Sequence, residues 1–281
     1  MTAQILFLNG EFLPSNTAGI SPNDRGFLLG DGLFETLRCH QGKALMLKDH
    51  WHRFSNGTKQ LKIDLPVTIE SLGKLISQLL SRNHLDHCET GVRVTLTRGS
   101  GDRGISPSSN TNPTLLITCF PLPQKKNSIS LTLSNLTINE QSPLRAFKSL
   151  AYTEKILARQ QAMTAGFDDA LLCNTREGLV SATSANIFLV IDGDLHTPAL
   201  DCGALPGVMR AQVIKIATQK KIIVHERTIS TDDLNEATEI FLTSALVGIL
   251  PVKQYEKKSL MAPGEMSQRL QALIPSALIS L

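Results

Sequence analysis

Cysteine is scarce in this sequence, and its spacing excludes the usual structural uses of the residue. The five cysteines are odd in number, far apart and without a C-x-x-C pair: Cys39, Cys88, Cys119, Cys173 and Cys202. We therefore expect free thiols in a reducing, cytoplasmic compartment and no disulfide framework. His50 and His52 stand close together, but they have no carboxylate or cysteine at the spacing of metal ligands, so we expect no metal site.

Long apolar runs and strong charge are also missing. No stretch reaches the roughly 18 apolar residues of a membrane helix, and the first residues, MTAQILFLNGEFLPS, lack the basic region of a signal peptide. The formal net charge is only +3, from 28 basic and 25 acidic residues that are dispersed along the chain. We therefore expect neither a nucleic acid nor a membrane as a partner.

Apolar residues are plentiful, and the chain is long for a single core. It has 281 residues, of which 42% are hydrophobic, so we expect two domains. The stretch FPLPQKKNS at 120–128 combines two prolines with two lysines and is the best linker candidate. We place a first domain at residues 1–119 and a second at 129–281. Strands alternate with helices in both, which predicts an α/β or α+β fold.

Periodicity and turn residues predict the main elements. Asn-Gly and Gln-Gly pairs predict hairpins at 5–10 and 33–46. Helices are expected from 48, at 69–81 with Thr68 as cap, at 151–165, at 208–219 and at the C-terminus. Further strands are expected at 91–99, 113–120, 128–136, 168–174, 178–191, 222–229 and 239–245, the last leading into an irregular loop.

Lys148 is the first residue with candidate chemistry. It stands in PLRAFKSLAY, between Phe147 and Leu150 and just before a helix. By base rate such a lysine extends its amine into solvent from a helix end. The alternative is a desolvated lysine whose amine pKa falls, which suits Schiff-base formation or general-base catalysis.

Three other elements could bind an anion. In LPGVMRAQVI, a Pro-Gly pair precedes a predicted helix, so the amides of Val208 and Met209 could face a phosphate, although an ordinary turn is an equal alternative. Ser244 ends an apolar strand, and Arg53 could grip a phosphate through two hydrogen bonds. Together with the candidate amine, these elements indicate a phosphorylated aldehyde cofactor, pyridoxal 5′-phosphate.

At this point the sequence resembles the fold-type IV pyridoxal 5′-phosphate enzymes, nearly from end to end. The resemblance implies a smaller N-terminal α/β domain, a larger C-terminal pseudo-barrel domain that binds the cofactor, and a homodimer. The family includes aminotransferases for branched-chain or D-amino acids and 4-amino-4-deoxychorismate lyase, an enzyme of folate biosynthesis. The segments that carry the resemblance are DRGFLLGDGLFETLR, HWHRF, RGSGDRG, Lys148 with the following helix, SATSANIFLV, LPGVMR and SALVGILPV.

The resemblance assigns roles residue by residue. Lys148 matches the lysine that binds the cofactor, and Arg53, Val208, Met209 and Ser244 match the phosphate-binding positions. RGSGDRG and SALVGILPV are more similar to the lyase than to the aminotransferases. They imply that Arg103, with Arg98, binds substrate carboxylates, although a solvated hairpin tip is the alternative for both arginines. Phe34 and Thr36 are further candidates for the substrate pocket, with core packing as the alternative for Phe34.

Ser181 marks a departure from the family. Members carry a glutamate five residues before the asparagine of the S-A-N-I-F element, where it contacts the pyridine nitrogen of the cofactor, but the residue five positions before Asn186 is Ser181. A serine hydroxyl can donate to an unprotonated nitrogen, which makes the ring a weaker electron sink. The sequence therefore favours the lyase over an aminotransferase, with a cofactor-binding homologue of weak activity as a third interpretation.

Overall fold

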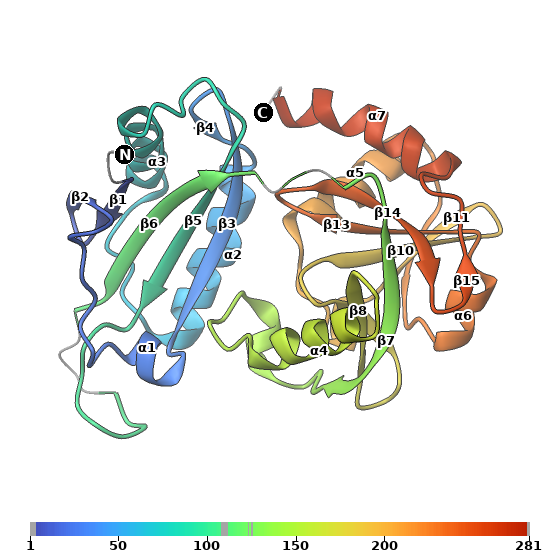
Figure 1. Cartoon of the computed structure of the whole chain (residues 1–281), viewed down its shortest axis with the longest axis horizontal. Coiled ribbons are helices and arrows are strands. Elements are labelled where there is room, and N and C mark those ends of the chain that lie inside the picture. The colour runs from blue at the N-terminus through green and yellow to red at the C-terminus, as the bar shows by residue number, and fades with distance from the viewer. Residues whose placement is uncertain (1–3, 108–111, 123, 125, 280–281) are drawn as a thin grey trace. The chain divides into compact units, whose positions relative to one another are not determined.

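A computed structural model of the chain describes residues 4–107, 112–122, 124 and 126–279, and it divides into two compact units (Figure 1). The first unit comprises Met1–Pro123 and Phe147–Ala151, and the second comprises Gln124–Ala146 and Tyr152–Ser280. The division at 123/124 falls within the stretch expected to link two domains. Within the described residues, no helix is long and apolar enough to cross a membrane.

The first unit is built on one antiparallel sheet of six strands. Its order is β2-β1-β6-β5-β3-β4, and every neighbouring pair runs antiparallel. Asn9 and Gln41 have positive φ in the two-residue turns that join β1 to β2 and β3 to β4, so both predicted hairpins are confirmed. The strands are β1 (Ile5–Leu8), β2 (Glu11–Pro14), β3 (Gly32–His40), β4 (Lys43–Ala44), β5 (Thr90–Thr97) and β6 (Thr114–Pro121).

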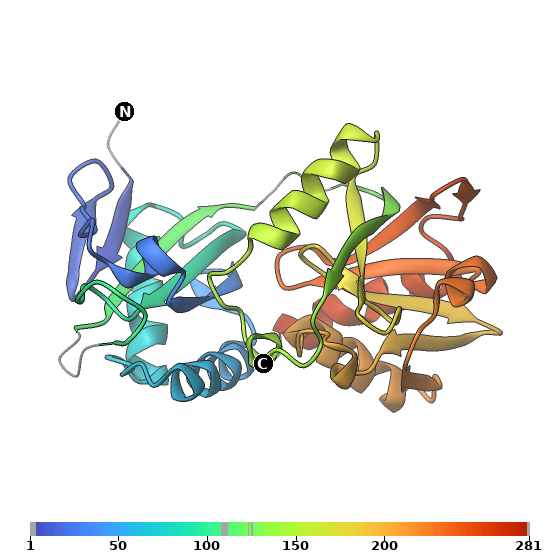
Figure 2. The ribbon, with the colours of Figure 1, turned by 90° about the horizontal axis from the view of Figure 1, so that it is seen from below.

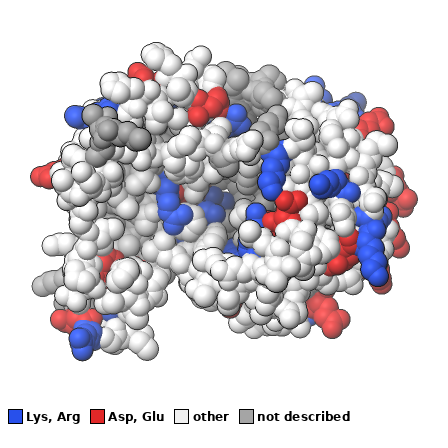
Figure 3. Space-filling view, viewed as in Figure 1, with Lys and Arg blue, Asp and Glu red and all other residues white. Residues whose placement is uncertain are grey.

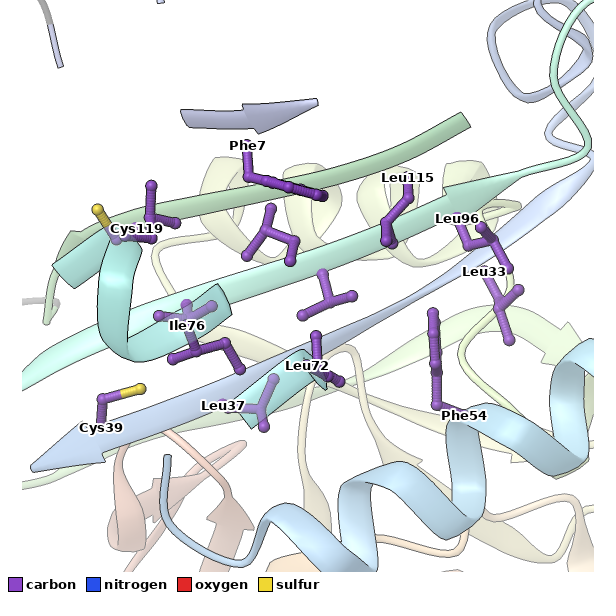
Figure 4. Close-up of a cluster of buried hydrophobic side chains, with 14 of the residues drawn as sticks. Phe7, Leu33, Leu37, Cys39, Phe54, Leu72, Ile76, Leu96, Leu115 and Cys119 are labelled. Carbon is purple, nitrogen blue, oxygen red and sulfur yellow. The ribbon is translucent and has the colours of Figure 1, made fainter. Parts of the chain in front are cut away.

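Three helices complete the first unit: α1 (Arg25–Leu29), α2 (Leu47–Leu61) and α3 (Ile69–Arg82). Thr68 caps α3 as predicted, in a capping box with Ser71. The helices and the sheet enclose an apolar core (Figure 4), in which Phe54 of α2 and Ile76 of α3 point towards side chains of the sheet such as Leu33. This core includes Phe147, although residue 147 is far away in the sequence.

The second unit contains a mixed sheet of nine strands in the order β12-β11-β10-β13-β14-β7-β8-β9, with β15 paired to β14. Three pairs are parallel, β11 with β12, β14 with β7 and β7 with β8. The sheet curls, because β9 at one end of the order also contacts β10 and β11 near the other end. The strands are β7 (Ile129–Ile138), β8 (Asp169–Asn174), β9 (Leu179–Ala182), β10 (Asn186–Ile191), β11 (Asp194–Pro198), β12 (Val224–Arg227), β13 (Glu239–Ser244), β14 (Gly248–Tyr255) and β15 (Lys258–Ser259).

Helices pack against different parts of this sheet (Figure 2). Helix α4 (Thr153–Thr164) packs on β7 and β8, whereas α5 (Val208–Gln219) and α7 (Glu265–Ile279) pack on each other and on β13. The short helix α6 (Thr231–Glu236) lies on β10. Two turns of 3-10 helix, η1 (Pro143–Ala146) and η2 (Leu200–Cys202), occur in the loops.

Two sequence expectations need correction. The stretch 178–191 is not one strand, because Thr183–Ala185 form a turn that the Ala182 amide closes on the Ala185 carbonyl at 3.0 Å. The expected loop after Ser244 is short, and strand β14 begins at Gly248. In both places the residues are small or apolar, so the sequence does not indicate that the chain turns. Hydrogen bonds in the folded chain determine the turn.

The surface charge is mixed in sign, and most of the cysteines are buried. On the face shown in Figure 3, acidic and basic side chains are interspersed among uncharged ones. All five cysteines are free thiols, and only Cys88 is exposed.

Candidate functional site

Lys148 lies on the edge of the first unit's sheet. The amide of Phe34 donates to the Lys148 carbonyl at 2.8 Å, and the amide of Leu150 donates to the Gly32 carbonyl at 3.0 Å. Phe147 is buried in the core of the first unit. The segment Phe147–Ala151 therefore belongs to this unit, which differs from the expectation that residues 129–281 form one domain.

The Lys148 amine lies over an aromatic ring. Its Nζ is 4.7 Å from the centroid of the Phe34 ring, and the guanidinium carbon of Arg93 is 3.6 Å from the same centroid. Burial lowers the pKa of the Lys148 amine to about 8, the charges of Arg53 and Arg93 act in the same direction, and Glu35 opposes them. An amine with this pKa has a substantial neutral, nucleophilic fraction at mildly alkaline pH.

Arg53 forms a buried ion pair that the sequence did not reveal. Its Nε donates to Oε1 of Glu35 and its Nη2 to Oε2, both at 2.7 Å. Burial opposes ionisation of Glu35, but Arg53 and His50 outweigh it and hold the pKa of the carboxyl at about 2. Glu35 takes one N–H of Nε and one of Nη2, two of the five donors of a guanidinium, so the phosphate contact of Arg53 stays a prediction.

Arg98 has a structural role in place of the expected substrate contact. Its Nε donates to Asp31 at 2.8 Å, its Nη1 to the Lys62 carbonyl at 2.9 Å and its Nη2 to the Leu61 carbonyl at 2.7 Å. Asp31 also binds Arg25 at 2.9 Å, so this one carboxylate holds both arginines. Burial opposes ionisation of Asp31, but the two arginines outweigh it and hold the pKa of its carboxyl below the usual value.

Arg103 is exposed in the loop that follows β5. Arg25 anchors this loop by donating to the carbonyls of Gly104 at 2.9 Å and Ile105 at 2.8 Å. The backbone is therefore held directly after Arg103, while the Arg103 side chain faces solvent. Exposure of Arg103 fits both interpretations that the sequence left open, the substrate contact and the solvated hairpin tip.

Phe34, Thr36 and Arg93 share one face of the sheet. Thr36 is directly opposite Arg93 in the register of β3 and β5, and Phe34 is opposite Thr95. Alternate residues of a strand point to the same side, so these side chains lie together, away from the core residue Leu33. The sequence analysis missed Arg93, although the alternation in GVRVTLTRG placed an arginine on this face.

The start of α5 lies where the sequence predicts an anion-binding helix terminus, in the second unit. The N-cap residue is Gly207, and no side chain caps the helix. Asn186 leaves no room for a side chain at residue 207, because a Cβ on Gly207 would lie 1.9 Å from Asn186 Oδ1. Asn186 also donates to the Leu205 carbonyl at 2.9 Å. The amides of Val208 and Met209 thus begin a helix whose dipole favours an anion.

Next to Ser244 in β13, Thr243 faces a residue that lies against the start of α5. Thr243 is directly opposite Asn186 in the β10–β13 pair, and the Thr243 hydroxyl is buried without a hydrogen-bond partner among the described residues. Ser244 ends β13, and its hydroxyl accepts a hydrogen bond from the Val247 amide at 3.4 Å. Asn186 and Thr243 therefore bring polar side chains near the start of α5, and the phosphate contact of Ser244 stays a prediction.

Ser181 lies in β9, buried and 8% exposed. Its hydroxyl donates to the carbonyl of the next residue, Ala182, at 2.8 Å. The following turn is held by Thr183, whose hydroxyl donates to the buried carboxylate of Asp169 at 2.6 Å. The turn brings Ser181 and Asn186 into one region of the second unit, whereas Lys148, Phe34, Thr36 and Arg53 lie in the first.

Replacing Gly207 with alanine tests the helix start. The added Cβ would displace Asn186, break its bond to Leu205 and shift the amides of Val208 and Met209. We expect the dissociation constant for pyridoxal 5′-phosphate, measured by absorbance titration, to rise at least about tenfold, the equivalent of 1.4 kcal/mol. Gly19→Ala is the matched control, since a Cβ at Gly19 meets open space. Unchanged binding by the Gly207 variant would contradict a phosphate at this helix.

Comparison with known proteins places the geometry in context. The model of a family described as amino-transferase class IV matches residues 32–255. A relative from Methanocaldococcus jannaschii, provisionally named a branched-chain-amino-acid aminotransferase, is 34% identical over 273 residues, which cover 95% of this chain and 93% of the relative.

Two solved structures of similar fold are named for a lyase. One, from Legionella pneumophila and provisionally named 4-amino-4-deoxychorismate lyase, has a TM-score of 0.88 and 30% identity, and the match covers 93% of this chain and 96% of that one. The other, 4-amino-4-deoxychorismate lyase from Pseudomonas aeruginosa, has a TM-score of 0.84 and 28% identity, covering 97% and 99%. The predicted fold class is confirmed by this likeness. The cofactor of the family is pyridoxal 5′-phosphate, and one solved structure of this fold holds its pyridoxamine form.

Proposed function

The chain belongs to the class IV aminotransferase family, and we propose that within it this protein is a pyridoxal 5′-phosphate-dependent lyase that converts 4-amino-4-deoxychorismate to 4-aminobenzoate and pyruvate. The observation that carries the proposal is the buried position of the Lys148 amine, 4.7 Å from the centroid of the Phe34 ring, where burial lowers its pKa to about 8. Support for a lyase comes from the RGSGDRG loop, the SALVGILPV turn, Ser181 and the two lyase-named structures at 30% and 28% identity.

The second unit supplies groups that would hold the cofactor. The amides of Val208 and Met209 would bind its phosphate together with the Ser244 hydroxyl, and Arg53 would add positive charge. The Ser181 hydroxyl would face the pyridine nitrogen by exchanging its present bond to the Ala182 carbonyl. When bound, the cofactor supplies an aldehyde for the Lys148 amine and a ring that withdraws electrons from the substrate.

Residues of the first unit would bind and act on the substrate. Lys148 would release the cofactor aldehyde to the substrate amine and then move a proton at the substrate carbon that carried it. Arg103 and Arg93 would bind carboxylates, with Thr36 opposite Arg93 and Phe34 as an apolar wall. Loss of pyruvate leaves an aromatic ring, and that gain drives the reaction forward.

The direct test is incubation of the purified protein with 4-amino-4-deoxychorismate, following 4-aminobenzoate by fluorescence and pyruvate by a coupled assay. Equal amounts of both products are expected. The Lys74→Met variant, which changes an exposed lysine of α3, should retain the activity. Absence of both products from the cofactor-loaded protein would reject the lyase proposal.

A branched-chain or D-amino acid aminotransferase is the second candidate, and the 34% identity to the Methanocaldococcus jannaschii relative favours it. The two candidates differ in the products that they form. A lyase expels pyruvate, whereas an aminotransferase leaves the amino group on the cofactor. Rapid formation of pyridoxamine 5′-phosphate from leucine or D-alanine, without turnover of 4-amino-4-deoxychorismate, would assign the chain to the aminotransferases.

A homodimer is part of the same proposal. Helix α1 presents three consecutive apolar side chains to solvent, Phe27 at 78%, Leu28 at 55% and Leu29 at 55% exposure, and such a cluster indicates an interface. We expect Phe27→Asp to shift the protein from dimer to monomer in light scattering. Ile223→Asp, at an isolated exposed apolar residue of the second unit, is the control. If Phe27→Asp is a dimer that resists dilution as well as the wild type does, α1 is not part of the interface.

A further inference from the structure

Arg25 belongs to the segment DRGFLLGDGLFETLR, but the proposed function gives this residue no role. Its side chain is only 4% exposed. Nη1 donates to the Gly104 carbonyl at 2.9 Å, Nη2 to the Ile105 carbonyl at 2.8 Å, and Nε to Asp31 at 2.9 Å. Arginines are seldom buried unless their charge is paired. Here Asp31 pairs the charge, and two further donors hold the backbone of the loop that follows β5.

The same residue also holds the other end of this loop. The backbone amide of Arg25 donates to the Gly99 carbonyl at 2.9 Å. One residue of α1 therefore binds the chain at 99 and again at 104 and 105. We call residues 99–105 the arginine loop, because Arg103 lies inside it, directly before Gly104. The two attachments of Arg25 close this loop around Arg103.

Burial contributes little to the conformation of the arginine loop. Residues 102–107 are exposed, and even the apolar side chain of Ile105 is 90% exposed. Gly104 has a φ of +106°, which side chains other than that of glycine rarely allow, and a Cβ there would meet open space. Hydrogen bonds to the backbone therefore have the larger share in fixing this loop, and Arg25 provides them at both ends.

Asp31 would stay paired if Arg25 were changed. Its carboxylate also accepts from Arg98, from Nε at 2.8 Å and from Nη2 at 3.1 Å. Removal of the Arg25 guanidinium thus leaves no isolated carboxylate, which would be costly in a largely buried position. A change at Arg25 is therefore expected to release the arginine loop without unfolding the unit.

We propose that Arg25 is a positioning residue for Arg103: by holding both ends of the arginine loop, it keeps the Arg103 side chain in place for a substrate carboxylate. A loop that is ordered before binding loses less conformational entropy when the substrate binds. The inference rests on the substrate contact of Arg103 in the proposed function. Lysine at position 25 would keep the charge beside Asp31, but it lacks the planar fork that reaches two carbonyls at once.

Trypsin tests the attachment in the full-length apoprotein. The enzyme cleaves after arginine, and the bond between Arg103 and Gly104 adjoins a carbonyl that Arg25 holds. Because proteolysis follows local opening, we expect cleavage at this bond, followed by mass spectrometry, to be about tenfold faster in Arg25→Lys. Arg227→Lys is the matched control, since Arg227 also binds a carbonyl and an aspartate but lies in the second unit.

Steady-state kinetics of the cofactor-loaded protein test the effect on the substrate. In Arg25→Lys we expect KM for 4-amino-4-deoxychorismate to rise about tenfold, the equivalent of 1.4 kcal/mol, with kcat within about twofold of wild type. In an Arg103→Ala background the same change should alter KM by less than about twofold, because the residue that Arg25 positions is gone. Arg227→Lys should leave both constants at their wild-type values.

Gly104→Ala is a second variant, which decides if Arg25→Lys does not fold. Gly104 is exposed, so its replacement does not disturb the core, but alanine is strained at a φ of +106° and would turn the carbonyl away from Arg25. We expect the same rise in KM, again absent in the Arg103→Ala background. Gly166→Ala is the matched control, with a φ of +86° and open space at its Cβ in the second unit.

Two results would overturn the inference. One is wild-type cleavage after Arg103 in Arg25→Lys, and the other is a KM increase that is equally large with and without Arg103. Failure of the proposed function looks different, because the wild type would then form neither 4-aminobenzoate nor pyruvate while the trypsin comparison stays valid. The KM comparison is in that case made on pyridoxamine 5′-phosphate formation from leucine or D-alanine, which also carry a carboxylate.

Discussion

Replacing Lys148 with methionine is expected to abolish turnover and, at the same time, to stabilise the apoprotein. Activity should fall at least about a thousandfold, because the residue supplies both the attachment and the proton transfer. Burial holds the pKa of the amine at about 8, against 10.5 for a free lysine. Keeping this amine protonated in the fold at pH 7 therefore costs up to about 3 kcal/mol, which methionine does not incur.

The pH dependence identifies the cause of this stabilisation. Below pH 8 the wild-type amine is protonated in both the folded and the unfolded chain, so the cost is fully present. Between about pH 8 and 10.5 only the unfolded chain binds the proton, so wild-type stability rises with pH and the advantage of methionine disappears. Urea unfolding at pH 7 and pH 10.5 measures the difference, with Lys74→Met as control. An advantage that is equal at both values would point to packing instead of charge.

Replacing Ser181 with glutamate is expected to shift the chemistry towards transamination. A carboxylate at the pyridine nitrogen would keep the ring protonated and strengthen its electron sink. We expect the rate of pyridoxamine 5′-phosphate formation from leucine or D-alanine, followed by absorbance, to rise about a hundredfold. In the apoprotein the same carboxylate is buried without a partner, so the unfolding free energy should fall by about 2 kcal/mol.

Binding of the cofactor should restore the stability lost in Ser181→Glu, because the pyridinium then pairs with the carboxylate. Ser184→Glu is the matched control, since Ser184 lies in the same turn but is exposed. A cofactor spectrum and a half-reaction rate that both match wild type would show that Ser181 does not face the ring nitrogen.

Patterns with a local physical cause were predictable from the sequence. The start of α5 at Val208 follows from Pro-Gly before an apolar-periodic run, and the cap of α3 follows from Thr68. The break within 178–191 was not predictable, because small hydroxyl residues suit a strand and a turn equally. A bond from Thr183 to Asp169, which comes from another strand, decides between them.

Charged side chains of the site were harder to predict than the elements that carry them. The sequence alone does not distinguish its arginines by their surroundings. In the fold, Arg53 is buried against Glu35, Arg98 is paired with Asp31 and Arg103 is exposed. Arg93 went unnoticed because its role depends on the strand register that sets it opposite Thr36. The role of each arginine depends on contacts with residues distant in sequence, and a single sequence does not show which residues form these contacts.

The bridge between Leu33 and Ser149 joins residues more than a hundred positions apart, and this separation has a kinetic consequence. Contacts so distant in sequence close large loops and form slowly. Most of the first unit's core can assemble from the preceding residues, whereas Phe147 and the lysine segment must wait until the chain has passed residue 151. The reactive amine is thus set in place late in folding, and a fragment ending at residue 123 would contain the first unit's sheet without its nucleophile.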